Sequence, residues 1–220
     1  MPVMSELEFI HRFVPATAGQ SGHVLLLLHG TGGDESDLLP LGRELDPDAA
    51  LLSPRGKVLE NGRPRFFRRL AEGVFDEADV VRRANELADF VGAAAVRYGF
   101  DPRRLTAVGY SNGANIAAAV LLLRPEALTR AILFRAMVPL VPAQPPDLAH
   151  ARILISSGAH DPIVPVENAE RLAATLREAG ANVTLRFEAA GHPLAPGDIA
   201  AAKGWLHDRG GGSAFAKAPA

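Results

Sequence analysis

The stretch Gly109-Tyr110-Ser111-Asn112-Gly113 separates two apolar segments, residues 105–108 and residues 114–123. The first segment is typical of a buried strand and the second of a buried helix. A serine between them is expected on a sharp strand-to-helix turn, where glycines two residues to either side let the two backbones approach closely. The pattern G-x-S-x-G also occurs in ordinary turns. Together with its flanking strand and helix, it predicts a turn that exposes a nucleophilic serine.

Composition and charge exclude several kinds of protein. The chain has 220 residues, 48% of them hydrophobic, which suffices for a sizeable core. A formal net charge of −2 gives no reason to expect nucleic acid as a partner. The absence of cysteine excludes disulfides and thiolate metal sites, and no histidines and acids have metal-ligand spacing, so we expect no metal and no cofactor. An acidic N-terminus and the lack of a long apolar run predict a cytoplasmic protein without membrane insertion.

Strand-like and helix-like segments alternate along the chain. The strands are fully apolar, which predicts a mostly parallel central sheet with helices on both faces, an α/β fold. We expect one domain over residues 1–209 and a disordered Gly- and Ala-rich tail over 210–220. An arginine-rich segment over 54–75 is expected to be irregular. The expected strands are 9–14, 24–28, 49–53, 105–108, 131–134, 153–156 and 183–187, and the expected helices are 34–45, 77–98, 114–123, 167–179 and 199–207.

A serine hydroxyl needs an adjacent base to act as a nucleophile at neutral pH, and the base needs an orienting partner. In parallel sheets such groups gather at the carboxyl ends of the strands. Asp161 follows the expected strand 153–156, and His192 follows the expected strand 183–187. We therefore predict Ser111 as nucleophile, His192 as base and Asp161 as the acid that orients it.

Other acids and histidines have simpler interpretations. Asp147 lies in a proline-rich loop, and Asp198 is expected to cap the last helix. His160 is the alternative to His192, but its neighbour Asp161 would then lose its partner geometry. His29 is expected to brace the glycine-rich loop that follows it. The remaining histidines, predicted to lie at the surface, are His11, His23, His150 and His207.

Acyl transfer also requires donors for the oxyanion that forms on attack. We predict the backbone N–H groups of Asn112 and of Thr31, which lies in the glycine-rich run 29–34. That run lacks the Lys-Ser/Thr pair of a phosphate-binding loop. Arginines 63, 65, 68 and 69 form the basic cluster of the chain. A solvated face is the favoured interpretation of this cluster, and a site for an acidic substrate group is the alternative.

These motifs together resemble the carboxylesterase/phospholipase family of the α/β-hydrolases, which includes acyl-protein thioesterases and lysophospholipases. The resemblance covers most of residues 25–206 and rests on HGTGGD at 29–34, the serine turn, GAHDPIVP at 158–165 and Gly191-His192. The order Ser, Asp, His is that of the α/β-hydrolase triad. The resemblance implies a serine hydrolase that cleaves carboxylic esters through an acyl-enzyme.

Within the family, the chain looks most like the small bacterial carboxylesterases. Thioesterase and lysophospholipase members usually carry G-F-S-Q-G, whereas this chain has Tyr110 and Asn112. The sequence has no long insertion between its expected strands, so we expect no large lid domain. We therefore expect a shallow pocket for a small or medium ester. The residues expected to line that pocket are Phe66, Phe67, Met137 and Val138.

Three alternatives stay open at this point. One is an acyl thioesterase or lysophospholipase of the same family. Another is a catalytically silent interaction module. The presence of all three triad residues argues against this alternative. The apolar run 137–141 fits either a pocket lining or a homodimer interface.

Overall fold

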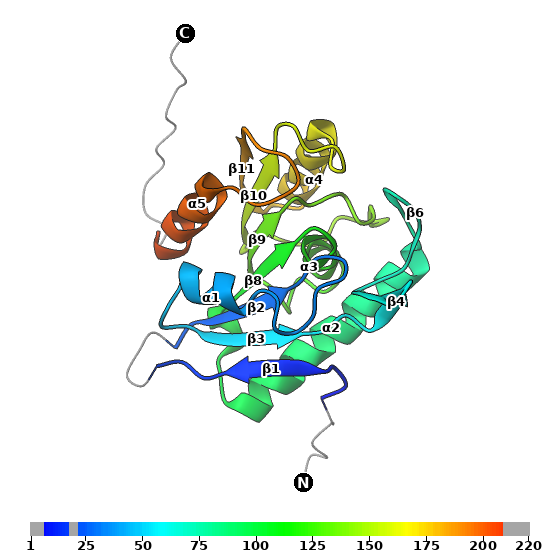
Figure 1. The fold of residues 1–220 in the computed structure, drawn as a ribbon. Helices are drawn as coiled ribbons and strands as arrows, with labels where there is room; N and C mark the ends of the chain where they lie inside the picture. The colour runs from blue at the N-terminus through cyan, green and yellow to red at the C-terminus, as the bar shows by residue number, and fades with distance from the viewer. Residues whose placement is uncertain (1–6, 18–21, 209–220) are drawn as a thin grey trace.

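A seven-stranded sheet forms the middle of the molecule in the computed structural model, which describes residues 7–17 and 22–208 (Figure 1). The strand order is β1-β3-β2-β8-β9-β10-β11, and every neighbouring pair is parallel except β1 with β3. The predicted mostly parallel sheet is confirmed. Its strands are β1 His11–Val14, β2 Val24–Leu28, β3 Ala50–Pro54, β8 Leu105–Tyr110, β9 Arg130–Phe134, β10 Arg152–Gly158 and β11 Asn182–Glu188.

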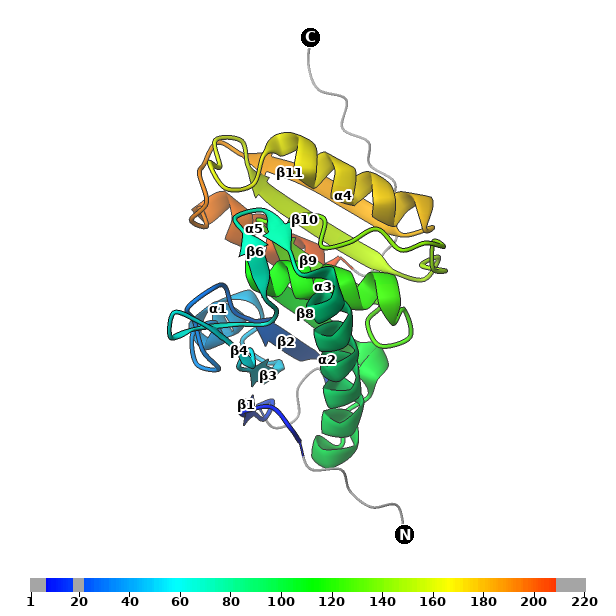
Figure 2. The ribbon, with the colours of Figure 1, turned by 90° about the vertical axis from the view of Figure 1, so that its right-hand side faces the viewer.

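Helices cover both faces of this sheet, as predicted (Figures 1 and 2). One face packs against α2 (Glu77–Tyr98), α3 (Asn112–Leu123) and α4 (Val166–Glu178). The other face packs against α1 (Leu39–Leu45) and α5 (Pro196–His207). Side chains that alternate along the strands therefore contribute to two separate apolar cores, one on each face of the sheet. These cores support the carboxyl edge of the sheet.

The helices differ from the sequence prediction mainly at α1. Helix α2 has the predicted bounds, with Asp76 accepting a hydrogen bond from the backbone N–H of Asp79 at its start and Gly99 at φ 68° at its end. The helix expected over 34–45 begins only at Leu39. Pro40 explains the shorter helix: it has no N–H to donate and its ring would clash with the preceding turn.

The segment expected to be irregular forms two short hairpins instead. Strands β4 (Val58–Glu60) and β5 (Arg63–Arg65) pair in one, and β6 (Arg69–Ala71) and β7 (Val74–Phe75) pair in the other. Asn61 and Gly62 connect β4 to β5 with φ of 51° and 76°, as a tight hairpin turn requires. Between β3 and α2 the described chain holds these hairpins and no lid domain.

Two further expectations concern the chain as a whole. The tail predicted over 210–220 lies outside the described residues. Across residues 7–17 and 22–208, no helix combines the length and the apolar character needed to cross a bilayer.

Candidate active site

Ser111 lies directly after β8, at the start of α3, in a strained backbone conformation. Its φ is 52° and its ψ is −114°, values that non-glycine residues rarely adopt. The Ser111 backbone N–H donates to the Phe134 carbonyl at 2.9 Å, which ties the turn to the neighbouring strand β9. A side chain at Gly113 would overlap the carbonyl of Leu28, so only glycine lets α3 lie this close to β2. This is the sharp turn expected from the G-x-S-x-G pattern.

The structure brings Ser111, His192 and Asp161 into one hydrogen-bonded relay. His192 Nε2 lies 3.1 Å from Ser111 Oγ, and His192 Nδ1 lies 2.8 Å from Asp161 Oδ2. An ionised carboxylate only accepts hydrogen bonds, so Nδ1 carries the proton. Nε2 is then free to accept the proton of the serine hydroxyl, which is the arrangement that nucleophilic catalysis by serine needs.

The Asp161 side chain is fully buried and fully satisfied. Oδ2 accepts from His192, while Oδ1 accepts the backbone N–H groups of Ile163 at 2.8 Å and Val164 at 3.1 Å. These bonds fix the carboxylate in the position that orients the imidazole. Its rival Asp147 is exposed, and among the described residues it accepts the N–H of Ala149 in its own loop.

The rival histidines lie elsewhere. His160 is exposed, and so are His150 and His207. The surface prediction was wrong for His11 and His23, which are half-buried: His11 bonds Tyr98, and His23 lies between Asp46 and Thr106. Neither lines the Ser111 cavity. His23 precedes β2, at the amino end of that strand, and His11, in the edge strand β1, pairs with Pro54.

Arg135, directly after β9, holds the loop that carries His192. Its guanidinium is fully buried and donates to the carbonyls of Gly191 at 3.0 Å and Pro193 at 2.9 Å, on either side of His192. Like Ser111, it has a positive φ, 55°. Arg135 was not among the predicted site residues, although a charged side chain immediately after an apolar strand is a signal of a role at the carboxyl edge of the sheet.

The counter-charge of Arg135 is Asp198, in the first turn of α5. The two form a bidentate pair at 2.7 and 2.9 Å with both side chains fully buried. Burial raises the pKa of Asp198, but the hydrogen bonds from Arg135, Ser156 and the Ala195 N–H outweigh it and hold that pKa below its ordinary value. Asp198 does cap its helix as predicted, by accepting the Ala195 N–H at 2.8 Å. Its larger role is to neutralise Arg135.

Tyr110 also contacts His192 and helps to hold it in place. Its hydroxyl donates to the His192 carbonyl at 3.2 Å, and its ring lies 5.4 Å from the imidazole. A Cβ at Gly30 would lie 2.9 Å from the Tyr110 ring, so a glycine at position 30 makes room for this side chain. Burial, the largest influence, raises the pKa of Tyr110, which keeps its hydroxyl protonated as a donor.

The two predicted oxyanion donors, the backbone N–H groups of Thr31 and Asn112, belong to residues that line the same cavity as Ser111. Neither N–H donates a hydrogen bond to any residue that the structure describes. His29 braces the Thr31 loop: its Nδ1 bonds the Gly30 carbonyl at 2.7 Å and its Nε2 accepts the Gly56 N–H at 3.0 Å. Burial lowers the pKa of His29, which keeps Nε2 unprotonated for that second bond.

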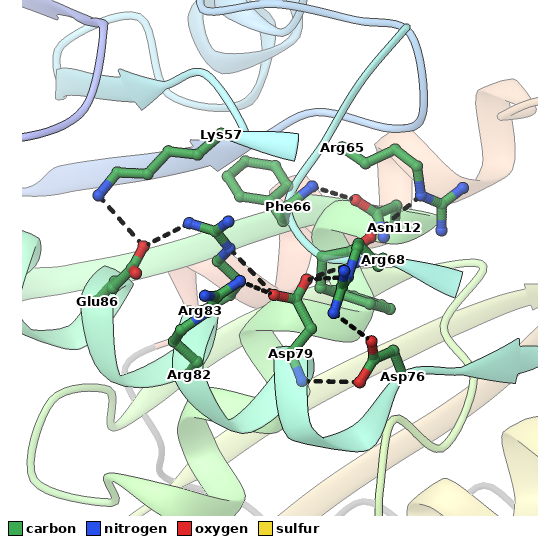
Figure 3. Close-up of polar contacts among 11 residues, drawn as sticks. Lys57, Arg65, Phe66, Arg68, Asp76, Asp79, Arg82, Arg83, Glu86 and Asn112 are labelled. Carbon is green, nitrogen blue, oxygen red and sulfur yellow. Dashed lines mark hydrogen bonds and ion pairs between the residues drawn. The ribbon is translucent and has the colours of Figure 1, made fainter. Parts of the chain in front are cut away.

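The side chain of Asn112 fastens the arginine-rich segment to the start of α3. Its Oδ1 accepts the backbone N–H of Phe66 at 2.7 Å (Figure 3). Two residues on, the backbone N–H of Arg68 donates to Asp79 of α2 at 2.8 Å, and Arg82 and Arg83 pair with the same carboxylate (Figure 3). The segment is thereby held at two points beside the serine.

A cavity of about 400 Å³ opens at Ser111 and His192. Its lining differs from the prediction, because only Met137 of the four expected residues is part of it. Phe66 and Phe67 are buried in the core against His29 and Phe75, and Val138 packs on the same core. The apolar lining consists of Phe75, Met137 and Ile163.

Charged side chains also line this cavity, namely Arg63, Arg65, Arg69 and Glu72. The solvated-face interpretation was wrong for Arg65, which is 3% exposed and donates to Thr31 Oγ1 at 2.8 Å. Burial, the largest influence, lowers the pKa of Arg65. Arg68 is exposed and turns away to Asp76. Over the described ranges, no three histidine or acidic side chains are arranged to hold a metal ion.

Comparison with known proteins agrees with this fold. The model of the phospholipase/carboxylesterase family matches residues 11–207, so the chain belongs to that family and is a hydrolase of the esterase type. The crystal structure of the Bacillus cereus carboxylesterase is 48% identical, with a TM-score of 0.87 over 90% of this chain and 93% of that one.

Two further relatives extend the comparison. A carboxylesterase from Mesorhizobium loti is 34% identical, with a TM-score of 0.87 over 93% of this chain and 97% of that one. The MhqD protein of Bacillus subtilis (strain 168) is 50% identical over 190 residues, which are 86% of this chain and 95% of MhqD.

Proposed function

We propose that this protein is a serine carboxylesterase that cleaves small to medium esters through an acyl-enzyme. The observation that carries the proposal is the hydrogen-bonded triad Ser111–His192–Asp161, with distances of 3.1 and 2.8 Å. Ser111 and His192 line a cavity together with Thr31 and Asn112, whose backbone N–H groups donate to no residue that the structure describes. The ester class of the substrate follows from the family.

The reaction takes place in two halves. His192 Nε2 accepts the hydroxyl proton as Ser111 Oγ bonds to the ester carbonyl carbon, and the N–H groups of Thr31 and Asn112 donate to the oxygen that becomes negative. His192 then gives the proton to the leaving alcohol as the ester C–O bond breaks. Water, deprotonated by His192, attacks the acyl-enzyme and releases the acid and the free serine. Asp161 keeps the proton on Nδ1 and stabilises the imidazolium in both halves.

The cavity favours short acyl groups. Its volume of about 400 Å³ is at the small end of ligand sites, and arginines occupy part of its wall. The apolar wall is limited to three side chains, which suits a few methylene groups rather than a long lipid chain.

The test is covalent labelling of Ser111 together with turnover of 4-nitrophenyl acetate and butyrate. A fluorophosphonate should label the wild type, and Ser111→Ala should lose labelling and at least about 1000-fold in kcat. Ser36→Ala is the matched control, since Ser36 lies outside the cavity, and it should behave as wild type. Full labelling and turnover in Ser111→Ala would overturn the proposal.

A further inference from the structure

We propose that the site selects esters that carry a second, carboxylate group, and that Arg63 binds this group. The inference rests on the proposed esterase function and deepens it by naming a substrate class. Arg63 lines the same cavity as Ser111 and His192, so a group bound there belongs to the substrate being cleaved.

Arg63 differs from the other two cavity arginines in having no counter-charge. Arg65 and Arg69 share the carboxylate of Glu60, at 3.2 and 2.9 Å. Arg63 makes no ion pair with any acid in the described part of the chain. Its hydrogen bond there is to the Thr31 carbonyl, at 3.3 Å. A guanidinium has five N–H donors in a planar fork, so most of its capacity stays open toward a ligand.

The guanidinium of Arg63 lies in a position that the surrounding backbone is shaped to accept. It passes over Gly32, where a Cβ would lie 2.8 Å from Arg63 Nε, and Gly32 has a φ of 89° that disfavours any other residue. The Gly32 N–H donates to the carbonyl of Pro64 at 2.9 Å, which joins the glycine-rich run 29–34 to the β4–β5 hairpin. The hairpin itself is continuous with Phe66, which Asn112 holds. Arg63 is therefore carried by a braced hairpin rather than by a free loop.

The charge around the cavity favours an anion over a cation. Three arginines face two glutamates, Glu60 and Glu72, and Glu72 is exposed at the tip of the β6–β7 hairpin. A carboxylate matches the fork of Arg63 in a bidentate arrangement. The apolar wall formed by Phe75, Met137 and Ile163 would contact the short chain between that carboxylate and the ester.

Matched ester pairs test the inference. On the acyl side the pair is mono(4-nitrophenyl) adipate against 4-nitrophenyl hexanoate, and on the alcohol side it is 3-carboxyphenyl acetate against phenyl acetate. We expect wild-type kcat/KM to favour the carboxylated member of at least one pair by about five- to tenfold at low salt. The ratio should fall as ionic strength rises, because Arg63 is exposed.

Three variants locate the effect. Arg63→Gln should bring the ratio to about one, and Arg63→Lys should keep part of it. Arg97→Gln, which removes an exposed arginine outside the cavity, should keep the whole preference. A ratio near one for both pairs in the wild type, or an unchanged ratio in Arg63→Gln, would overturn the inference. Failure of esterase function is distinguishable, since neutral esters would then not be cleaved and Ser111 would not be labelled.

Discussion

At the scale of single residues, the candidate site depends on side chains whose unusual positions serve a neighbour. Ser111 and Arg135 both have positive φ, and both follow directly after parallel strands. Each strained residue is fixed by bonds to an adjacent strand: Ser111 N–H to Phe134, and Arg135 N–H to Ser156. The cost of these conformations is offset by the surrounding sheet, which leaves the side chains no alternative position.

Removing the Tyr110 hydroxyl should lower both stability and activity. Tyr110→Phe loses the bond to the His192 carbonyl, which we expect to cost about 1 kcal/mol of unfolding free energy and a few-fold in kcat/KM. Urea unfolding and ester kinetics measure the two effects. Tyr98→Phe is the control, because Tyr98 bonds His11 outside the cavity. It should lose stability but keep kcat/KM, and equal loss of kcat/KM in both variants would contradict the assigned role of Tyr110.

At the scale of elements, the buried pair Arg135–Asp198 joins β9, the His192 loop and α5. One guanidinium satisfies carbonyls of Gly191, Pro193 and Ser156 and the carboxylate at the start of a helix. Because the pair is fully buried, removing one partner leaves the other charge buried without a counter-charge. That change lowers the free energy of unfolding far more than replacing both partners does. The position of the His192 loop is thus coupled to the docking of α5.

Arg135→Met should therefore be strongly destabilising, by about 3–5 kcal/mol, because it leaves Asp198 buried without a partner. The double variant Arg135→Met/Asp198→Leu should recover part of that stability, as measured by urea unfolding. Its kcat/KM should stay reduced, since the carbonyls beside His192 still lack their donor. A double variant with wild-type kcat/KM would show that Arg135 is not a positioning residue for His192.

At the scale of the whole molecule, arginine–carboxylate contacts make the fold sensitive to acid. Hydrogen bonds from arginines are the largest influence lowering the pKa of Glu35, Glu60 and Asp101. In a second group burial is the largest influence and raises the pKa, but hydrogen bonds and ion pairs outweigh it. This group consists of Asp79, Glu86, Glu126 and Asp198. In all seven carboxyls the folded pKa lies below the ordinary value, so the unfolded chain binds more protons in acid.

The stability from these carboxyls is fully present above their ordinary pKa values and is lost as pH falls through the folded ones. We expect the unfolding free energy to fall between about pH 5 and about pH 3, measured by urea unfolding at each pH. Asp198→Asn should show a smaller drop over the same interval. Equal unfolding free energies at both pH values would contradict the prediction.

Much of this architecture was predictable because it depends on local patterns. The apolar strands, α2 and the parallel order follow from periodicity, and strand ends predict where Ser111, Asp161 and His192 meet. The pocket was predicted poorly. Phe66 and Phe67 were expected in the pocket because they lie beside arginines, but they are buried. Asn112 and Asp79, both outside this segment, accept the backbone N–H groups of Phe66 and Arg68 and hold the segment in place. The short hairpins over 58–75 have strands of two or three residues, too short for a periodic signal.

The distance along the chain between Arg135 and Asp198 has a consequence for how the protein is made. The two residues are 63 positions apart, and Arg135 leaves the ribosome first. Until Asp198 has been translated, Arg135 has no acid with which to form its buried ion pair, and α5 cannot dock beside the His192 loop. A nascent chain therefore reaches residue 198 before the His192 loop can take its folded position. We therefore expect chains that stop before residue 198 to carry Ser111 without a fixed His192 loop.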